Sequence, residues 1–235
     1  MTGRAGGRPS GRGAKVRVKT AARRRPSSTR WLERQLNDPY VAEARRLGYR
    51  SRAAFKLIQL DDRFHFLGAG KRVVDLGAAP GGWSQVAAAR VAPAGKPPGR
   101  IVAADMLPME PVGGAIVLQL DCSTVEAPAI IRDALGGPAE VVLSDMAPPA
   151  TGHAPTDHLR ILALAEAAYE TARELLAPGG TFVAKVWQGG ASGELLATLK
   201  RDFASVRHVK PEASRSESAE VYLVAQGFRG GGKPC

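Results

Sequence analysis

Five short apolar runs, separated by helical patterns, most constrain what this chain can fold into. The runs occupy residues 72–76, 100–105, 115–121, 140–145 and 180–186. A strand with one face in water alternates apolar and polar residues, whereas a strand of a parallel sheet is apolar on both faces because helices cover each side. The sequence therefore predicts an α/β fold built on a mostly parallel sheet.

Two later apolar runs complete this prediction. Residues 206–209 and 220–225 are close enough in sequence to form antiparallel neighbours at one edge of the sheet. We therefore expect seven strands, mostly parallel with an antiparallel edge strand, and helices on both faces.

Helical patterns precede and interrupt the strands. We expect one helix to start near residue 28 and a second to run over residues 38–60. A helix over residues 157–176 should stop at Pro178-Gly179-Gly180, which favours a turn. A solvated helix face explains most of the charges on the second helix, which are Arg45, Arg46, Arg50, Arg52 and Lys56.

A chain of 235 residues suits one folded domain, which we place at residues 31–228 between a disordered basic arm (1–30) and a flexible tail (229–235). The arm holds ten Lys or Arg and no acid, although the whole chain has a net charge of +11. Such an arm suits a polyanion such as RNA; a solubilising tail and a mitochondrial presequence are the alternatives. The sequence lacks a run of eighteen apolar residues and a secretory signal, so we expect a soluble intracellular protein.

The sequence predicts no metal site. Cys122 and Cys235 have no Cys or His nearby at metal-ligand spacing, and His153 and His158 lack a third ligand. We expect Cys122 to be a small buried residue and the two histidines to face solvent.

The segment Asp75-Leu76-Gly77-Ala78-Ala79-Pro80-Gly81-Gly82-Trp83 joins the first predicted strand to a helix. Glycines in such a loop let the backbone approach a ligand closely, and a helix N-terminus offers unpaired N–H groups. The segment departs from the dinucleotide fingerprint Gly-x-Gly-x-x-Gly because Ala79 stands at the second glycine position. We interpret it as a cofactor loop; a tight turn without a ligand is the alternative.

Three aspartates each end one of the next three predicted strands. Asp105, Asp121 and Asp145 should therefore meet Asp75 at the carboxyl edge of the sheet, where open α/β sheets bind ligands. We assign Asp105 to ribose hydroxyls and Asp121 to an adenine amino group. Each aspartate taken singly fits a helix cap or turn equally well.

A lysine lies within the fifth apolar run. Burying Lys185 there costs free energy unless it is paired or neutral, and a lysine reaching out from a strand end is the alternative. If the last strand is antiparallel, Glu220 at its start meets Asp145 and Lys185 at one edge, and Lys56 is placed to fold across the same opening.

Three segments carry a specific resemblance to a known family: Tyr49-Arg50-Ser51-Arg52-Ala53-Ala54-Phe55-Lys56-Leu57, the cofactor loop extended through Ser84-Gln85, and Leu143-Ser144-Asp145-Met146-Ala147-Pro148. From about Trp31 to Gly227 the chain resembles the FtsJ/RlmE family of ribosomal RNA 2'-O-methyltransferases. Lys185 and Glu220 match the family's Lys-Asp-Lys-Glu pattern in order and context. The basic arm has no fixed counterpart in that pattern.

The resemblance implies a Rossmann-like, class I S-adenosylmethionine-dependent methyltransferase fold. It implies S-adenosylmethionine as cofactor, S-adenosylhomocysteine as product, and methyl transfer to the ribose 2'-hydroxyl of a uridine in 23S ribosomal RNA on the assembled 50S subunit. We accordingly expect a monomer that binds ribosomal RNA and no membrane, cytoplasmic in a bacterium and mitochondrial in a eukaryote.

The resemblance also implies the site residues. An acceptor hydroxyl is a poor nucleophile unless a general base removes its proton while the hydroxyl is held in line. The resemblance implies that Lys185 comes closest to this role of general base. The implied catalytic tetrad is Lys56, Asp145, Lys185 and Glu220. The implied cofactor contacts are Gly81, Trp83, Asp105, Asp121 and Asp145.

Two other functional classes compete with this hypothesis. A nicotinamide-dependent oxidoreductase would share the glycine loop and Asp105, but it leaves Lys185, Lys56 and Glu220 without a role. A ribosome-assembly factor that binds RNA without turnover has no need of an intact tetrad. NADH binding and the effect of Lys185→Ala would discriminate these classes.

Overall fold

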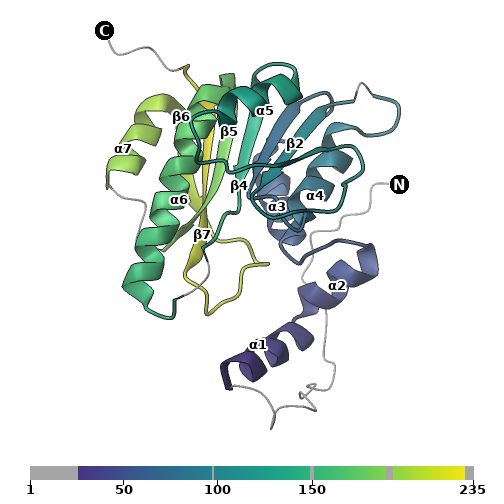
Figure 1. Ribbon diagram of the computed structural model, residues 1–235, viewed down its shortest axis with the longest axis vertical. Helices are drawn as coiled ribbons and strands as arrows, with labels where there is room; N and C mark the ends of the chain where they lie inside the picture. The colour runs from purple at the N-terminus through teal and green to yellow at the C-terminus, as the bar shows by residue number, and fades with distance from the viewer. Residues whose placement is uncertain (1–25, 97, 149–150, 189–192, 231–235) are drawn as a thin grey trace.

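A seven-stranded sheet runs through the protein, with helices on both of its faces (Figure 1). The computed structural model describes residues 26–96, 98–148, 151–188 and 193–230. The strands are β1 (Arg72–Leu76), β2 (Arg100–Asp105), β3 (Ile116–Gln119), β4 (Ala139–Ser144), β5 (Leu176–Trp187), β6 (Phe203–Val209) and β7 (Glu220–Phe228).

The strand order is β3-β2-β1-β4-β5-β7-β6. The pairs among β1 to β5 are parallel, whereas β7 pairs antiparallel with both β5 and β6. The expected mostly parallel fold is confirmed, and β7 lies one position in from the edge. The order reverses at β1, and the carboxyl ends of β1 and β4 flank this switch point, which is where open α/β sheets bind ligands.

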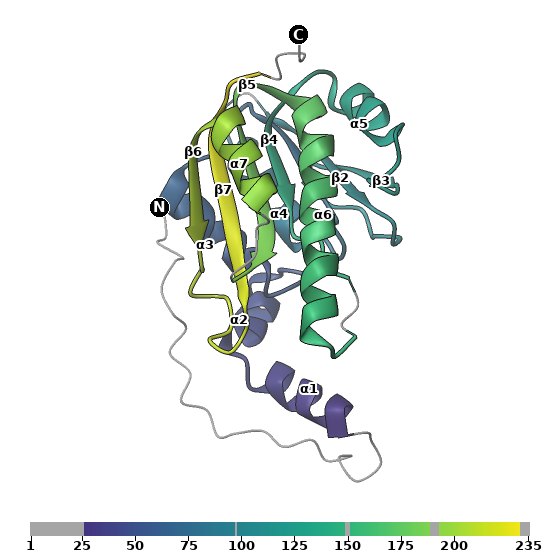
Figure 2. The ribbon, with the colours of Figure 1, turned by 90° about the vertical axis from the view of Figure 1, so that its left-hand side faces the viewer.

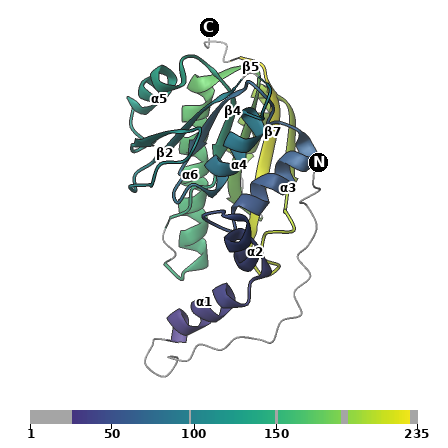
Figure 3. The same ribbon diagram turned by 90° about the vertical axis from the view of Figure 1, so that its right-hand side faces the viewer.

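Helices cover both faces, as Figures 2 and 3 show from opposite sides. Successive residues explain why: Val73 packs with α3 and α4, while Val74 packs with α5 and α6 on the other face. Both faces are dry, so Val73, Val74 and Leu76 are all apolar, and Asp75 is the one buried polar residue of this strand. The helices are α1 (Pro26–Leu36), α2 (Pro39–Leu47), α3 (Ala54–Phe64), α4 (Gly82–Val91), α5 (Ala127–Leu135), α6 (Ala154–Leu175) and α7 (Gly193–Asp202).

The predicted helix over residues 38–60 is wrong, because the structure has two helices there. Asp38 caps α2 by accepting a hydrogen bond from the Tyr40 backbone N–H at 3.1 Å. Gly48 ends α2 in the left-handed conformation at φ 77°, which other residues rarely adopt. The chain then turns before α3 starts at Ala54.

Two other boundaries also differ from the sequence prediction. Pro178-Gly179-Gly180 forms an irregularity inside β5, where the register against β4 shifts, and β5 follows α6 directly. Helix α1 begins at Pro26, so residues 26–30 of the expected arm are helical. Residues 1–25 and 231–235 lie outside the described residues. None of the described helices has the length and hydropathy needed to cross a bilayer.

The central strand β4 should tolerate loss of packing poorly. Leu143 is fully buried there, so Leu143→Ala should lower the free energy of unfolding by about 2–5 kcal/mol, measured by urea denaturation. Leu159→Ala is the matched control because Leu159 is 64% exposed on α6, and it should change stability by less than about 0.5 kcal/mol. Equal effects of the two changes would contradict this description of the core.

Candidate active site

The carboxyl edge of the sheet gathers the acidic residues that the sequence placed there. Helices α1 and α2 extend past this edge, on the same side as the β6–β7 loop (Figure 3). The carboxylates of Asp145 and Asp105 lie close enough to Asp75 to raise its pKa. The predicted convergence of β1, β2 and β4 aspartates is therefore seen in the structure.

The glycine loop between β1 and α4 is tightly enclosed. Gly81 has φ 106°, and a Cβ there would lie 2.9 Å from Val112 Cγ2 and 3.0 Å from Arg50 Nη1. Only glycine fits such a position without strain. Arg50 holds the loop by donating from Nη1 to the Pro80 carbonyl at 3.2 Å and from Nη2 to the Pro111 carbonyl at 2.6 Å.

Asp105 and Asp121 differ in what they already hold. Asp105 accepts from the backbone N–H groups of Ala79 and Leu107, at 2.9 and 2.8 Å, so it links the glycine loop to the end of β2. Asp121 lies in the turn after β3, which ends at Gln119, and its Oδ1 accepts from both N–H and Oγ of Ser123. Asp121 thus forms a turn through its Oδ1 atom.

The Trp83 side chain belongs to the core. It is 3% exposed, its Nε1 donates to the Ala53 carbonyl at 2.8 Å, and its ring centroid lies 5.6 Å from that of Tyr222. Its backbone N–H belongs to the first turn of α4, where N–H groups have no intrahelical acceptors. A cofactor contact from Trp83 would therefore come from the backbone.

Asp75 is a buried carboxyl group with spare hydrogen-bonding capacity. Oδ2 accepts from Ser84 Oγ at 2.6 Å, while Oδ1 is buried and has no partner among the described residues. Burial raises the pKa of Asp75 to about 7; Asp145 and Asp105 act in the same direction, and the Ser84 hydrogen bond opposes them. An unpaired buried oxygen of this kind suits a cationic or N–H group of a ligand.

The four residues of the predicted tetrad form two ion pairs. Lys56 Nζ lies 2.7 Å from Glu220 Oε1, and Lys185 Nζ lies 3.1 Å from Asp145 Oδ1. Lys185 also donates to the Asp145 backbone carbonyl at 2.6 Å. The Lys185 side chain is only 8% exposed, so the two acceptors offset the cost of its burial.

Tyr222 joins the two pairs. Its hydroxyl donates to Asp145 Oδ1 at 2.7 Å, and Lys56 Nζ lies 5.8 Å from its ring centroid. Burial and the Asp145 and Glu220 carboxylates raise the pKa of Tyr222 well above its ordinary value, so the hydroxyl remains a donor. Burial alone would raise the pKa of Asp145, but the charges of Lys185 and Lys56 and the bonds from Tyr222 and Lys185 hold it below the ordinary value.

The sequence reasoning missed three contributors. Tyr222 pairs with Lys185 in the β5–β7 register, and strand periodicity places it on the same face as Glu220, which was an available signal. Arg50 and Arg52 were interpreted as part of a solvated face, but both bond to segments far away in the sequence. Those partners come from tertiary folding, so no local pattern reveals them.

The other candidates have ordinary surroundings. Cys122 is buried, as expected, and burial raises its pKa to about 11. His153 Nδ1 lies 2.8 Å from Thr156 Oγ1, and the His158 ring lies 6.1 Å from that of Trp187. Among the described residues, no three His, Cys, Asp or Glu side chains are placed to hold a metal ion. Cys235 lies outside the described residues.

Comparison with known proteins decides the family. The FtsJ-like methyltransferase family matches residues 49–228. The chain belongs to this family. It is 62% identical over 229 residues to the ribosomal RNA large subunit methyltransferase E of Paramagnetospirillum magneticum, covering 96% of this chain and 93% of that one. It is 58% identical over 231 residues to the enzyme of the same name from Parvibaculum lavamentivorans, covering 96% and 91%.

A solved structure agrees with the family. The crystal structure of a Plasmodium falciparum protein described as a ribosomal RNA methyltransferase superposes with a TM-score of 0.69 at 29% identity. The match covers 78% of this chain and all of that one. The chain is thus a methyltransferase with the class of fold that its sequence predicted, and it requires a methyl donor. The oxidoreductase and non-catalytic hypotheses find no support in these relatives.

The raised pKa of Asp75 makes stability depend on pH. An unfolded carboxyl loses its proton near pH 4, but the folded one keeps it to about pH 7, so wild-type stability should fall as pH rises between these values. The neutral Asp75→Asn amide lacks this loss and still accepts from Ser84. In urea unfolding, the free energy of unfolding of the variant relative to that of the wild type should rise by a few kcal/mol between about pH 4.5 and about pH 7.5. A difference that is constant with pH would contradict the assignment.

Proposed function

We propose that this methyltransferase transfers the methyl group of S-adenosylmethionine to the ribose 2'-hydroxyl of a uridine in 23S ribosomal RNA, on the assembled 50S subunit. The observation that carries the proposal is the pairing of Lys185 with Asp145 and of Lys56 with Glu220, beside the glycine loop. The names of the relatives support ribosomal RNA as the substrate.

The residues at the β1–β2 half of the edge fit such a cofactor. Gly81 and the Trp83 backbone N–H would lie along its methionine moiety, and the open Asp75 oxygen suits its amino group. Asp105 would accept from its ribose hydroxyls, Asp121 from its adenine amino group, and Asp145 stands between cofactor and acceptor. When bound, S-adenosylmethionine supplies an electrophilic methyl group on a sulfonium.

The lysines act on the acceptor. Lys185 Nζ, once its own ammonium proton has passed to solvent, would accept the proton of the 2'-hydroxyl, which increases the electron density on the attacking oxygen. Asp145 and Tyr222 fix the position of Lys185, because Asp145 holds both groups through Oδ1. Lys56, held by Glu220, would orient the ribose oxygen and balance negative charge as the proton leaves.

One chain supplies all four residues, so the proposed reaction needs no second copy and we infer a monomer. We place the protein in the bacterial cytoplasm, where large ribosomal subunits mature. Residues 1–25, which lie outside the described residues, would add charge for RNA binding.

Lys185→Met tests the proposal most directly. It removes the proton acceptor while keeping an unbranched side chain, so transfer from labelled S-adenosylmethionine to large subunits of a strain lacking the enzyme should fall by about 10²-fold or more. The product is mapped by the resistance of the modified ribose to alkaline cleavage.

The matched control is Lys200→Met, on the exposed surface of α7, which should keep wild-type activity. A wild-type protein that binds S-adenosylmethionine but modifies no ribose would overturn the assigned acceptor. Equal activity in the Lys185→Met and Lys200→Met proteins would remove Lys185 from the mechanism.

A further inference from the structure

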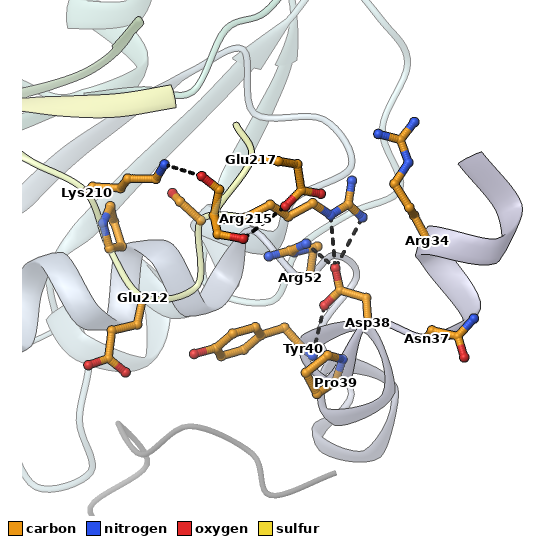
Figure 4. A pocket seen from close by; sticks show the side chains of 13 residues that line it. Arg34, Asn37, Asp38, Pro39, Tyr40, Arg52, Lys210, Glu212, Arg215 and Glu217 are labelled. Carbon is orange, nitrogen blue, oxygen red and sulfur yellow. Dashed lines mark hydrogen bonds and ion pairs between the residues drawn. The ribbon is translucent and has the colours of Figure 1, made fainter. Parts of the chain in front are cut away.

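A pocket lies beside the Glu220 end of the tetrad (Figure 4). The corner between α1 and α2, the start of α3 and the β6–β7 loop enclose a pocket of about 670 Å³. This volume is in the range of small-ligand sites. Its walls include four cationic side chains: Arg34, Arg52, Lys210 and Arg215.

Two guanidinium groups share one carboxylate in this pocket. Arg52 and Arg215 both form ion pairs with Asp38 Oδ2, and the distance from Arg215 Nη2 to this oxygen is 3.1 Å. The Asp38 side chain is 6% exposed. Asp38 supplies one negative charge for the two guanidinium groups, and Glu217 on the rim interacts electrostatically with Arg215 and Arg34. The four cationic side chains still outnumber these two carboxylates. Within the described part of the chain, Arg52 Nε is also buried without a hydrogen-bond partner. Excess positive charge with an open N–H suits an anionic ligand.

The remaining charges divide between the pocket and its rim. Lys210 Nζ donates to the carbonyl oxygens of Ser216 and Ser218, which are neutral acceptors, so its charge also faces the pocket region. Glu212 and Glu217 line the exposed rim. Figure 4 shows the Glu212 carboxylate pointing away from Asp38 and the two arginines.

The pocket connects directly to the tetrad. Ser214, one of its lining residues, donates from Oγ to Glu220 Oε1 at 2.8 Å. Lys56 Nζ lies 2.7 Å from the same oxygen. A single carboxylate therefore separates the pocket from one of the two reactive lysines. The candidate cofactor residues lie along the part of the edge formed by β3, β2, β1 and β4, which leaves the β5–β7 part, and this pocket beyond it, for the acceptor.

We propose that the pocket is a subsite for the nucleotide next to the methylated one, and that Arg52 and Arg215 bind its phosphate. Asp38 keeps the two guanidinium groups together, and Lys210 and Arg34 add charge around them. Phosphate contacts of this kind position an RNA chain without reading its bases. The inference rests on the proposed function and adds to it the path by which the RNA leaves the tetrad.

Photocrosslinking locates the subsite. A benzoylphenylalanine at position 217, on the pocket rim, is irradiated with large subunits from a strain lacking the enzyme, and adducts are mapped by primer extension. The adduct should lie within about two nucleotides of the methylated one. The control at Glu174, exposed at the C-terminal end of α6, should give no adduct there. An adduct elsewhere, or equal yields from both positions, overturns the proposal.

Arg215→Ala tests the charge. The KM for large subunits should rise about tenfold, more than kcat falls, and the slope of log KM against log salt should drop by about one, because one phosphate contact is lost. The exposed β6 residue gives the matched control, Arg207→Ala, which should leave both unchanged.

Measuring S-adenosylmethionine affinity in the same variant separates a lost contact from a lost fold, since the affinity should equal that of wild type. An unchanged KM and salt slope in Arg215→Ala, with active wild-type protein, overturns the subsite alone. Absence of ribose methylation by the wild-type protein overturns the proposed function instead.

Discussion

The burial of Lys185 is the constraint on which the rest of the site depends. An ammonium group inside a sheet that is apolar on both faces is stable only if acceptors replace the water that it loses. The Asp145 carboxylate and carbonyl provide those acceptors, and Tyr222 in turn donates to the same carboxylate. Removing any one partner would leave a buried charge or hydroxyl without its bond, so these residues act as one unit.

The second lysine is positioned by the helical layer. Lys56 lies in the first turn of α3, and Trp83 in the first turn of α4 donates to the carbonyl of Ala53, the residue just before α3. Arg50, a few residues earlier, holds the glycine loop itself. The glycine loop and the Lys56–Glu220 pair are thus both held by the same short segment of chain. We expect this segment to set the position of the methyl donor relative to the acceptor.

Different parts of the carboxyl edge of the sheet carry different groups of functional residues, in the order of the strands. Asp75 within β1 and Asp105 at the end of β2 bond to the glycine loop and the start of α4. The two ion pairs lie at the ends of β4, β5 and β7, and the basic pocket follows at the β6–β7 loop. This arrangement suits a small donor at one end and a long anionic acceptor at the other. The surplus positive charge around Asp38 falls on the acceptor side, where a phosphate chain would pass.

The sequence alone determined the fold class, the strands and the residues of both ion pairs, because strand burial on two faces, glycine-rich turns and the family's motif order are local patterns. It also placed the aspartates at one edge. Only the tertiary structure decided that Asp121 forms a turn, that the Trp83 ring belongs to the core, and that Arg50 and Arg52 donate hydrogen bonds to backbone carbonyls far away in the sequence. It alone brought Asp38 and Arg215, which are far apart in the chain, into one pocket. Such contacts depend on where separate segments meet in space, and the spacing of residues along a chain carries no record of that.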